Sequence, residues 1–122
     1  MKITTVLVVE SVERSLEFWV GRMGFAETVE VPEGDKVGFA ILEKGGAEVM
    51  LQSASGVEKE DPKFSLIGTS AMLFVEVDDW ADTKKRLEGH PIAKAEHVTF
   101  YGMREIGVFE PGGHLVVFAA KA

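Results

Sequence analysis

Two stretches of the chain have strand-like apolar patterns on either side of a glycine-rich turn. In the later stretch, residues 104–109 and 114–119 are rich in apolar side chains and flank the turn sequence Glu-Pro-Gly-Gly. In the earlier stretch, residues 37–42 and 47–52 flank Glu-Lys-Gly-Gly in the same way. The pattern therefore predicts two β-hairpins, each closed by a turn that contains a Gly-Gly pair.

The two hairpins belong to an internal repeat. Aligning their Gly-Gly pairs gives an offset of 112 − 45 = 67 residues. Ser11 and Asp79 each follow a similar apolar run, and aligning them gives 79 − 11 = 68. Because two independent features agree on nearly one spacing, the sequence indicates two copies of one structural unit.

Each copy is predicted to contain a strand, a helix and three further strands. In the first copy a strand at 2–9 precedes a helix that Ser11 caps and Gly24 ends. The apolar face of this helix comprises Val12, Leu16, Trp19, Val20 and Met23. In the second copy Asp79 caps a helix with a sparser apolar face, which Gly89 ends. The fold class that follows is α+β, with two β-α-β-β-β modules and mostly antiparallel sheets.

The chain of 122 residues is predicted to be one domain, 1–122, built from two modules. Module one covers 1–53 and module two covers 71–122. Residues 54–70 have no sustained apolar period, so we expect them to be a linker or a mobile loop beside a site.

Composition and charge exclude several classes of function. The net charge of −7 disfavours nucleic acid as a partner, since phosphates require a basic surface. No apolar run reaches the length of about 20 residues that a membrane span needs, so we expect no membrane partner. The chain has no cysteine, which excludes disulfides, thiolate catalysis and Cys-based zinc sites. No secretory signal is recognisable, so the expected location is cytoplasmic.

Several short motifs together resemble a known family. They are ERSLEFW at 13–19, RMGF at 22–25, EVDD at 76–79, GMRE at 102–105 and EPGGH at 110–114. With the repeat, the chain resembles the vicinal oxygen chelate superfamily, which includes glyoxalases, extradiol dioxygenases, and fosfomycin and bleomycin resistance proteins. The resemblance implies paired modules that form an open, curved mixed sheet around a cavity. It also implies a homodimer with clefts near or across the dimer interface.

Enzymes of this superfamily hold one divalent metal ion with His, Glu and sometimes Gln. The resemblance transfers the four ligand positions to Thr4, Met50, Met72 and Val117. A thioether and an alkyl group do not bind the divalent ions used by the family, which prefer carboxylate oxygen or imidazole nitrogen. The sequence therefore predicts neither a metal site nor any other cofactor.

The resemblance implies that the side chains of these four positions face the trough, away from the helices, and strand alternation agrees with that placement. Their neighbours Ile3, Val49, Leu51, Leu73, Val75, Val116 and Phe118 would then face the helices and form the core. The predicted ligand-binding cleft comprises Thr4, Val6, Phe39, Glu48, Met50, Gln52, Met72, Phe74, Tyr101, Met103, Glu105 and Val117. This set is mostly apolar and aromatic with a few polar groups, which is typical of a small-molecule site.

The polar candidates allow two interpretations each. Glu48, Glu76 and Glu105 could meet in the cavity as acid, base or cation ligands, or could be solvated or paired with Lys and Arg. The spacing of His90, His97 and His114 matches no zinc motif, so ordinary surface positions are favoured. Phe100 and Tyr101 could form a stacking surface for a flat heteroaromatic ligand, or could cover the edge of the core.

Three functional hypotheses follow. The favoured one is a metal-independent binding protein that resembles bleomycin resistance proteins and sequesters a small molecule in a dimer-shared cleft. The ligand would be partly aromatic, and the acidic charge of the chain would allow it to be cationic. One alternative is a glyoxalase- or dioxygenase-like lyase or isomerase with relocated metal ligands drawn from Glu48, Gln52, Glu76 and Glu105. Another is a regulatory or structural dimer, so the sequence leaves open whether the protein is an enzyme.

Overall fold

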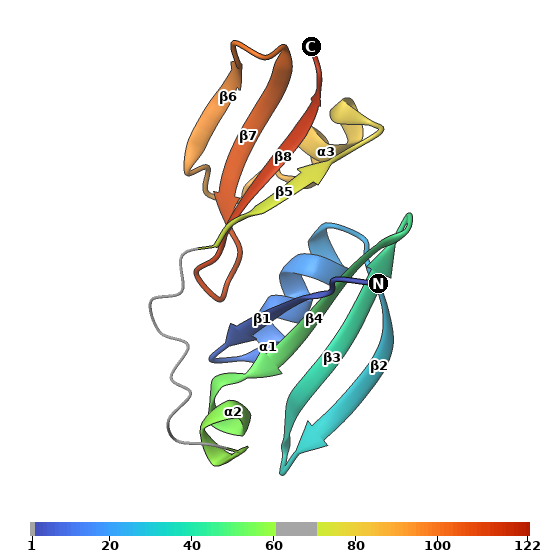
Figure 1. Cartoon of the computed structure of the whole chain (residues 1–122), viewed down its shortest axis with the longest axis vertical. Helices are drawn as coiled ribbons and strands as arrows, with labels where there is room; N and C mark the ends of the chain where they lie inside the picture. Colours follow the sequence, from blue (N-terminus) through green and yellow to red (C-terminus); the bar gives the residue numbers. More distant parts are fainter. Residues whose placement is uncertain (1, 61–70) are drawn as a thin grey trace. The chain divides into compact units, whose positions relative to one another are not determined.

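The protein forms two compact units, Met1–Thr69 and Ser70–Ala122. The computed structural model describes residues 2–60 and 71–122 (Figure 1). Each unit contains one four-stranded sheet and follows the β-α-β-β-β order that the sequence predicted. The predicted α+β class and the two repeated modules are therefore confirmed.

The first unit contains the elements β1 (Thr5–Val9), α1 (Val12–Leu16), η1 (Glu17–Arg22), β2 (Ala26–Glu33), β3 (Lys36–Lys44), β4 (Ala47–Ser53) and α2 (Ala54–Glu60). Its strands lie in the order β1-β4-β3-β2. β1 pairs with β4 in parallel, and the other pairs are antiparallel. The β3–β4 turn consists of Gly45 and Gly46, both with positive φ, which is the tight hairpin turn that only glycine adopts without strain.

The core of the first unit lies between the sheet and α1–η1. α1 packs on β3 and β4, and the sheet side chains toward it are buried; they are Leu7, Val9, Ala40, Leu42, Val49 and Leu51. Trp19 is fully buried at the centre of this layer, with edge-to-face contacts to Phe18 and Phe25 at centroid distances of 5.1 Å each. The expected core-facing positions Val49 and Leu51 are thus confirmed. Ile3 is not a core residue, because it precedes β1 and is 91% exposed.

The second half of the first helix is a π-helix, η1, which the sequence did not predict. Its wider turns are marked by the hydrogen bond from the Met23 N–H to the Phe18 carbonyl, five residues back. The longer turn rotates the side chains relative to an α-helix, so that Phe18 is fully covered while Leu16 and Val20 are only half-buried. The predicted apolar face is therefore fully buried at Val12, Trp19 and Met23 and partly exposed at Leu16 and Val20.

The second unit contains β5 (Leu73–Glu76), α3 (Trp80–Arg86), β6 (Lys94–Val98), β7 (Met103–Phe109) and β8 (Leu115–Lys121). Its strand order, β5-β8-β7-β6, repeats that of the first unit, and β5 pairs with β8 in parallel. Ser11 and Asp79 both cap their helices, as predicted, by accepting a backbone N–H three residues later.

The core of the second unit lies on the α3 side of its sheet. α3 packs on β8, and Lys84 on α3 forms an ion pair with Glu96 of β6 at 2.8 Å. Strand alternation puts the expected core residues Leu73, Val75, Val116 and Phe118 on this side. In the β7–β8 turn, the buried Glu110 carboxylate accepts hydrogen bonds from the backbone N–H and the ring of His114. This turn is therefore longer than its Gly45-Gly46 counterpart and is held by a side chain.

The predicted linker begins with a helix. Ala54–Glu60 forms α2, whereas the sequence indicated no regular structure there, and the remainder, 61–70, lies outside the described residues. The Ser53 hydroxyl accepts the Gly56 N–H at 3.0 Å, in the manner of a helix N-cap. In the described ranges, 2–60 and 71–122, no helix combines the length and apolar character needed to cross a lipid bilayer.

Candidate functional site

The first candidate surface is the side of the first sheet that faces away from α1, here called the α1-distal face. It carries Thr4, Val6, Val8, Val29, Val31, Phe39, Ile41, Glu48, Met50 and Gln52. The register aligns Val6, Met50 and Ile41 in one row across three strands, and Val8, Gln52 and Phe39 in the next. All predicted cleft residues of module one therefore share this face, which is apolar apart from a few side chains.

Glu48 is held by the N-terminal segment. Its carboxylate forms an ion pair with Lys2 Nζ at 2.9 Å and lies 3.4 Å from the Thr4 hydroxyl. The hydrogen bond from Lys2 lowers the pKa of Glu48. Of the two interpretations of Glu48, the structure therefore agrees with the one in which it pairs with a lysine of its own chain.

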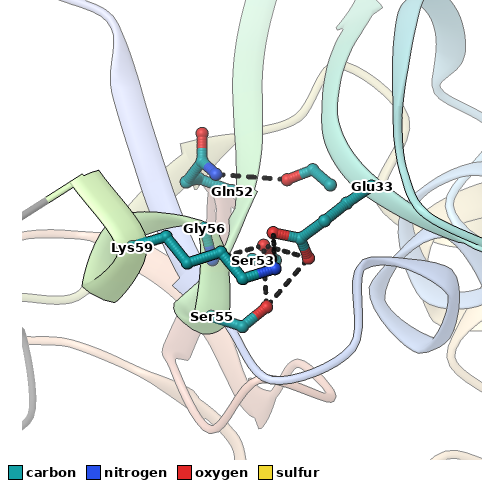
Figure 2. A network of polar contacts seen from close by, with 7 residues as sticks. Glu33, Gln52, Ser53, Ser55, Gly56 and Lys59 are labelled. Atoms are coloured by element: carbon teal, nitrogen blue, oxygen red, sulfur yellow. Dashed lines mark hydrogen bonds and ion pairs between the residues drawn. The ribbon is translucent and has the colours of Figure 1, made fainter.

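A polar cluster, here called the Glu33 cluster, lies at the end of this sheet beside α2 (Figure 2). One oxygen of the Glu33 carboxylate accepts the hydroxyls of Ser53 at 3.0 Å and Ser55 at 2.8 Å, and the other lies 3.8 Å from Lys59 Nζ. The bond from Ser55, with support from Ser53 and Lys59, lowers the pKa of Glu33. The cluster therefore ties α2 to the end of β2 and places the start of α2 next to Gln52.

The second candidate surface is the side of the second sheet away from α3, here called the α3-distal face. It carries Met72, Phe74, Glu76, Met103, Glu105, Gly107, Leu115, Val117 and Ala119. One row across the strands contains Phe74, Val117 and Gly107. The next contains Glu76, Ala119, Glu105 and, on β6, His97. The predicted strand residues of module two are thus brought to one face of one sheet.

Glu105 is the buried acidic group of the α3-distal face, with 4% of its surface exposed. Tyr101 donates its hydroxyl to Oε2 of Glu105 at 2.5 Å. This bond, together with burial and the negative charge of Glu105, raises the pKa of Tyr101. The other oxygen, Oε1, lies 3.8 Å from His97 Nε2, which is beyond hydrogen-bond distance.

His97 presents an acceptor to Glu105 when its ring is neutral. Its Nδ1 lies 2.9 Å from the carbonyl oxygen of Ala95. A carbonyl can only accept, so this contact places the ring proton on Nδ1 and leaves a lone pair on Nε2. With a neutral ring, Glu105 Oε1 and His97 Nε2 are two acceptors that face each other, and a group with N–H donors would satisfy both.

Two aromatic rings lie beside this carboxylate. Phe100 is fully exposed and Tyr101 is 55% exposed, and their rings are in edge-to-face contact at a centroid distance of 5.0 Å. Exposed aromatic rings next to a polar anchor are common in sites for flat ligands. The Tyr101 hydroxyl is bound to Glu105, while 55% of the Tyr101 surface stays exposed.

The four positions that the family resemblance implies do not fit a divalent ion. Thr4 and Met50 lie on the α1-distal face, and Met72 and Val117 lie on the α3-distal face. These positions offer one hydroxyl, two thioethers and one alkyl group, which are poor ligands for hard and borderline ions. Within residues 2–60 and 71–122, no three His, Asp or Glu side chains are close enough to hold a metal ion. The enzyme hypothesis draws relocated metal ligands from Glu48, Gln52, Glu76 and Glu105. The described residues contain no cluster of that kind.

A shallow pocket of about 300 Å³ lies on the outer side of η1, and none of the predicted cleft residues lines it. Leu16, Val20 and Gly21 line it together with three carboxylates, those of Glu13, Glu17 and Glu27. Burial and the neighbouring Glu30 raise the pKa of Glu27, while Glu13 accepts the backbone N–H of Val37. The pocket is thus lined by residues of α1, η1 and β2, and the sequence pattern did not predict it.

Two participants in the candidate sites were not foreseen from the sequence. His97 was interpreted as an ordinary edge histidine, although β6–β7 pairing puts it opposite Glu105. The Glu33 cluster joins residues about 20 positions apart, so its formation depends on α2, which was not predicted. The alternation of β6 and β7 could have revealed His97, but a bulge between Lys94 and His97 shifts the register.

Comparison with known proteins supports a common fold. The family model described as "Glyoxalase/Bleomycin resistance protein/Dioxygenase superfamily" matches residues 3–118. The chain is similar to the structure of TioX from Micromonospora sp. ML1, with a TM-score of 0.78, 22% identity and coverage of 100% of this chain and 99% of that one. A search of curated proteins gave no match.

Two further structures have the same fold. A glyoxalase/bleomycin resistance protein/dioxygenase family enzyme from Burkholderia phytofirmans PsJN gives a TM-score of 0.79 at 16% identity, covering 98% of this chain and 97% of that chain. A lactoylglutathione lyase from Agrobacterium tumefaciens gives 0.74 at 16% identity, covering 98% and 92%. The family match over most of the sequence and the shared fold lead to one conclusion. The chain belongs to the glyoxalase/bleomycin resistance protein/dioxygenase superfamily.

Proposed function

We propose that the protein is a metal-independent small-molecule binding protein, similar in role to the bleomycin resistance branch of its superfamily. Its ligand is a molecule that combines a flat aromatic system with a protonated amine. The aromatic part stacks on the exposed rings of Phe100 and Tyr101, and the amine binds at Glu105. Binding is carried out by side chains alone, because the family's metal positions hold Thr4, Met50, Met72 and Val117.

The observation that carries this proposal is the pair of acceptors formed by Glu105 and His97. A buried carboxylate normally has a cationic partner or several hydrogen bonds. Glu105 has one phenol donor on Oε2, while Oε1 lies 3.8 Å from His97 Nε2, an atom that offers a lone pair whenever the ring is neutral. A ligand ammonium placed between these atoms donates to both and neutralises the carboxylate. The nearby aromatic pair supplies the apolar contact for the rest of the ligand.

We also propose that the protein acts as a homodimer whose ligand cleft is shared between the two copies. The α1-distal face supports this, because Val6, Val29 and Val31 leave apolar surface exposed on it. Contiguous apolar surface of this kind is typical of interfaces and ligand grooves. Light scattering coupled to size-exclusion chromatography measures the oligomeric state. A monomer at micromolar concentration would contradict the proposal of a shared cleft.

Calorimetric titration tests the binding function. Metal-free and copper-loaded bleomycin are the probes, because each contains flat heteroaromatic rings and a cationic tail. We expect saturable binding to the wild-type protein after chelator treatment. Glu105→Gln should weaken it about 10- to 100-fold, the cost of losing a charge-assisted hydrogen bond. An absence of heat at high micromolar concentration would remove bleomycin as a ligand.

Glu17→Gln is the matched control. It removes one negative charge from η1, on the helix side of the first sheet and away from both helix-distal faces. We expect its affinity for the probe to be unchanged within about twofold, since it leaves Glu105 and the aromatic pair intact. Equal losses from Glu17→Gln and Glu105→Gln would show that net charge, and not the site at Glu105, governs binding.

A further inference from the structure

Lys94 is a cation beside Glu105 that the proposed binding mode does not use. β6 is the edge strand of the second sheet (Figure 1), and its register places Lys94 opposite Gly107 and His97 opposite Glu105. Because of the bulge, three steps along β6 correspond to two along β7, so Lys94 and His97 share the α3-distal face. The Ala93 N–H donates to the Gly107 carbonyl at 2.8 Å, which fixes this part of β6 against β7.

The side chain of Lys94 lies across Gly107. A Cβ atom at Gly107 would point to the α3-distal face, as the side chain of Glu105 does two residues earlier. This atom would lie 3.0 Å from Cβ, 3.2 Å from Cγ and 3.3 Å from Cδ of Lys94. The glycine therefore makes room for the hydrocarbon stem of Lys94, which packs on the sheet as far as Cδ.

The ammonium group of Lys94 is available to an anion. Lys84 and Arg104 of the same unit both pair with Glu96, whereas no ion pair within the ranges 2–60 and 71–122 includes Lys94. Because the stem is already held on Gly107, pairing with an anion orders fewer free bonds of the side chain.

Three chemical features follow one another along the α3-distal face. The rings of Phe100 and Tyr101 precede β7, Glu105 lies in the middle of the strand, and Gly107 with the Lys94 stem follows. Residues two apart on a strand are separated by about 6.6 Å, a distance that the flexible end of a lysine can span. A ligand on this face therefore meets an aromatic surface, then the carboxylate, then a cation.

We propose that Lys94 is a specificity-determining residue that selects zwitterionic aromatic ligands, in which an ammonium group lies between the ring and a carboxylate. This inference rests on the proposed function and adds the acidic group to the ligand. The ammonium group binds at Glu105, and the carboxylate accepts a hydrogen bond from Lys94 Nζ. An aromatic α-amino acid carries the three groups in this order.

Tryptophan and tryptamine test the selection. Both carry an indole ring and an ammonium group near neutral pH, and only tryptophan has a carboxylate. We expect the wild-type protein to bind tryptophan about fivefold more tightly in NMR titrations at low ionic strength, the upper value for an exposed ion pair. Added salt should reduce this preference, since it screens exposed charges. Lys94→Met keeps most of the stem on Gly107 and should bring the ratio of the two affinities to about one.

Lys121→Met and Lys85→Met are the matched controls, because each also removes one positive charge from the second unit. Lys121 lies beside Met103, on the aromatic side of Glu105, where a carboxylate would have to precede the ammonium group. Lys85 lies on α3, on the opposite side of the sheet. We expect both variants to keep the preference within about twofold.

Gly107→Ala tests the positioning of Lys94 without removing its charge. The added methyl group displaces the stem, so the preference should fall although the ammonium group is still present. Gly21→Ala is the control, since a Cβ atom there has no atom within 4 Å and should leave the preference unchanged. Circular dichroism establishes that each variant retains its fold, and Lys94→Met carries the test if Gly107→Ala does not fold.

Each result separates the inference from the proposed function. Equal affinity of the wild-type protein for tryptophan and tryptamine overturns the inference, and tryptamine binding that Glu105→Gln weakens leaves the proposed function standing. A preference that survives Lys94→Met, or that Lys121→Met removes equally, also overturns the inference. If neither compound binds, the inference is wrong, and bleomycin in the same titration then decides the proposed function: binding retains it and absence of binding removes it.

Discussion

The two units have the same fold but differ in the chemistry of their helix-distal faces. Their strand orders are equivalent, and both helices begin with a polar cap at positions 68 residues apart, Ser11 and Asp79. Ser15 and Thr83 follow at the same offset and are both buried. Trp19 and Leu87 are the next such pair, with 87 − 19 = 68, and both belong to the core.

The α1-distal face is apolar around Gln52, and its carboxylate Glu48 has Lys2 as a partner. The α3-distal face carries the buried Glu105 with Tyr101 and His97. Caps, turn glycines and strand alternation determine the fold, and they recur in both copies. Side chains on the helix-distal faces take no part in the helix–sheet cores, so they can differ without changing the topology.

The largest effect should come from the core position that the two units fill differently. Trp19→Ala should destabilise the protein by about 3–5 kcal/mol, because it leaves a large cavity and removes two ring contacts. Leu87→Ala at the equivalent position should cost less, toward the lower end of about 2–5 kcal/mol. Urea unfolding with hydrogen exchange measured in peptides of each unit provides both values. A larger loss for Leu87→Ala would contradict the central role of Trp19 in the first core.

A smaller effect is expected at the two hairpin turns. Gly46 and Gly113 both have positive φ, 84° and 91°, and a Cβ atom added at either position would meet no atom within 4 Å. Ala at either position should therefore cost about 1–2 kcal/mol from backbone strain alone. Thermal unfolding measures it, with Gly21→Ala as the unstrained control. A neutral Gly113→Ala would show that the longer turn, held by Glu110, adapts where the tight turn cannot.

The smallest effect is spectroscopic and concerns the α3-distal face alone. Tyr101 is the one tyrosine in the sequence, so absorbance at alkaline pH reports its ionisation without overlap from another. Its pKa should lie above the usual 10.0, because Glu105 accepts its hydrogen bond, and Glu105→Gln should bring it back toward that value. A raised pKa means that this bond contributes stability at pH below 10.0, which is lost as pH rises through the folded-state pKa. An unshifted titration would exclude the Tyr101–Glu105 bond in solution.

Local patterns predicted the repeated fold well. Period-two alternation identified the strands, Gly45-Gly46 identified a tight turn, and Ser11 and Asp79 identified the helix starts. The two elements that the sequence did not predict, η1 and α2, have non-local or subtle causes. η1 differs from an α-helix by the length of its turns, which the spacing of apolar residues does not encode, and α2 is joined to the end of β2 by a hydrogen bond that the Glu33 carboxylate accepts from Ser55.

The candidate sites were predictable to the extent that alternation determines them. The predicted strand residues of each module do share one face of their sheet, from Thr4 to Gln52 and from Met72 to Val117. Alternation could not show that Glu48 pairs with Lys2 while Glu105 is buried beside His97. Those differences arise from the placement of the chain ends and turns around each sheet.

The central claim is that this member of the superfamily binds its ligand without a divalent ion. Elemental analysis of protein purified without chelators or added metal tests it most directly. We predict well under one equivalent of any divalent metal in protein that binds the probe fully. One equivalent of bound metal, lost together with probe binding when Glu48 or Glu76 is changed to Ala, would contradict it.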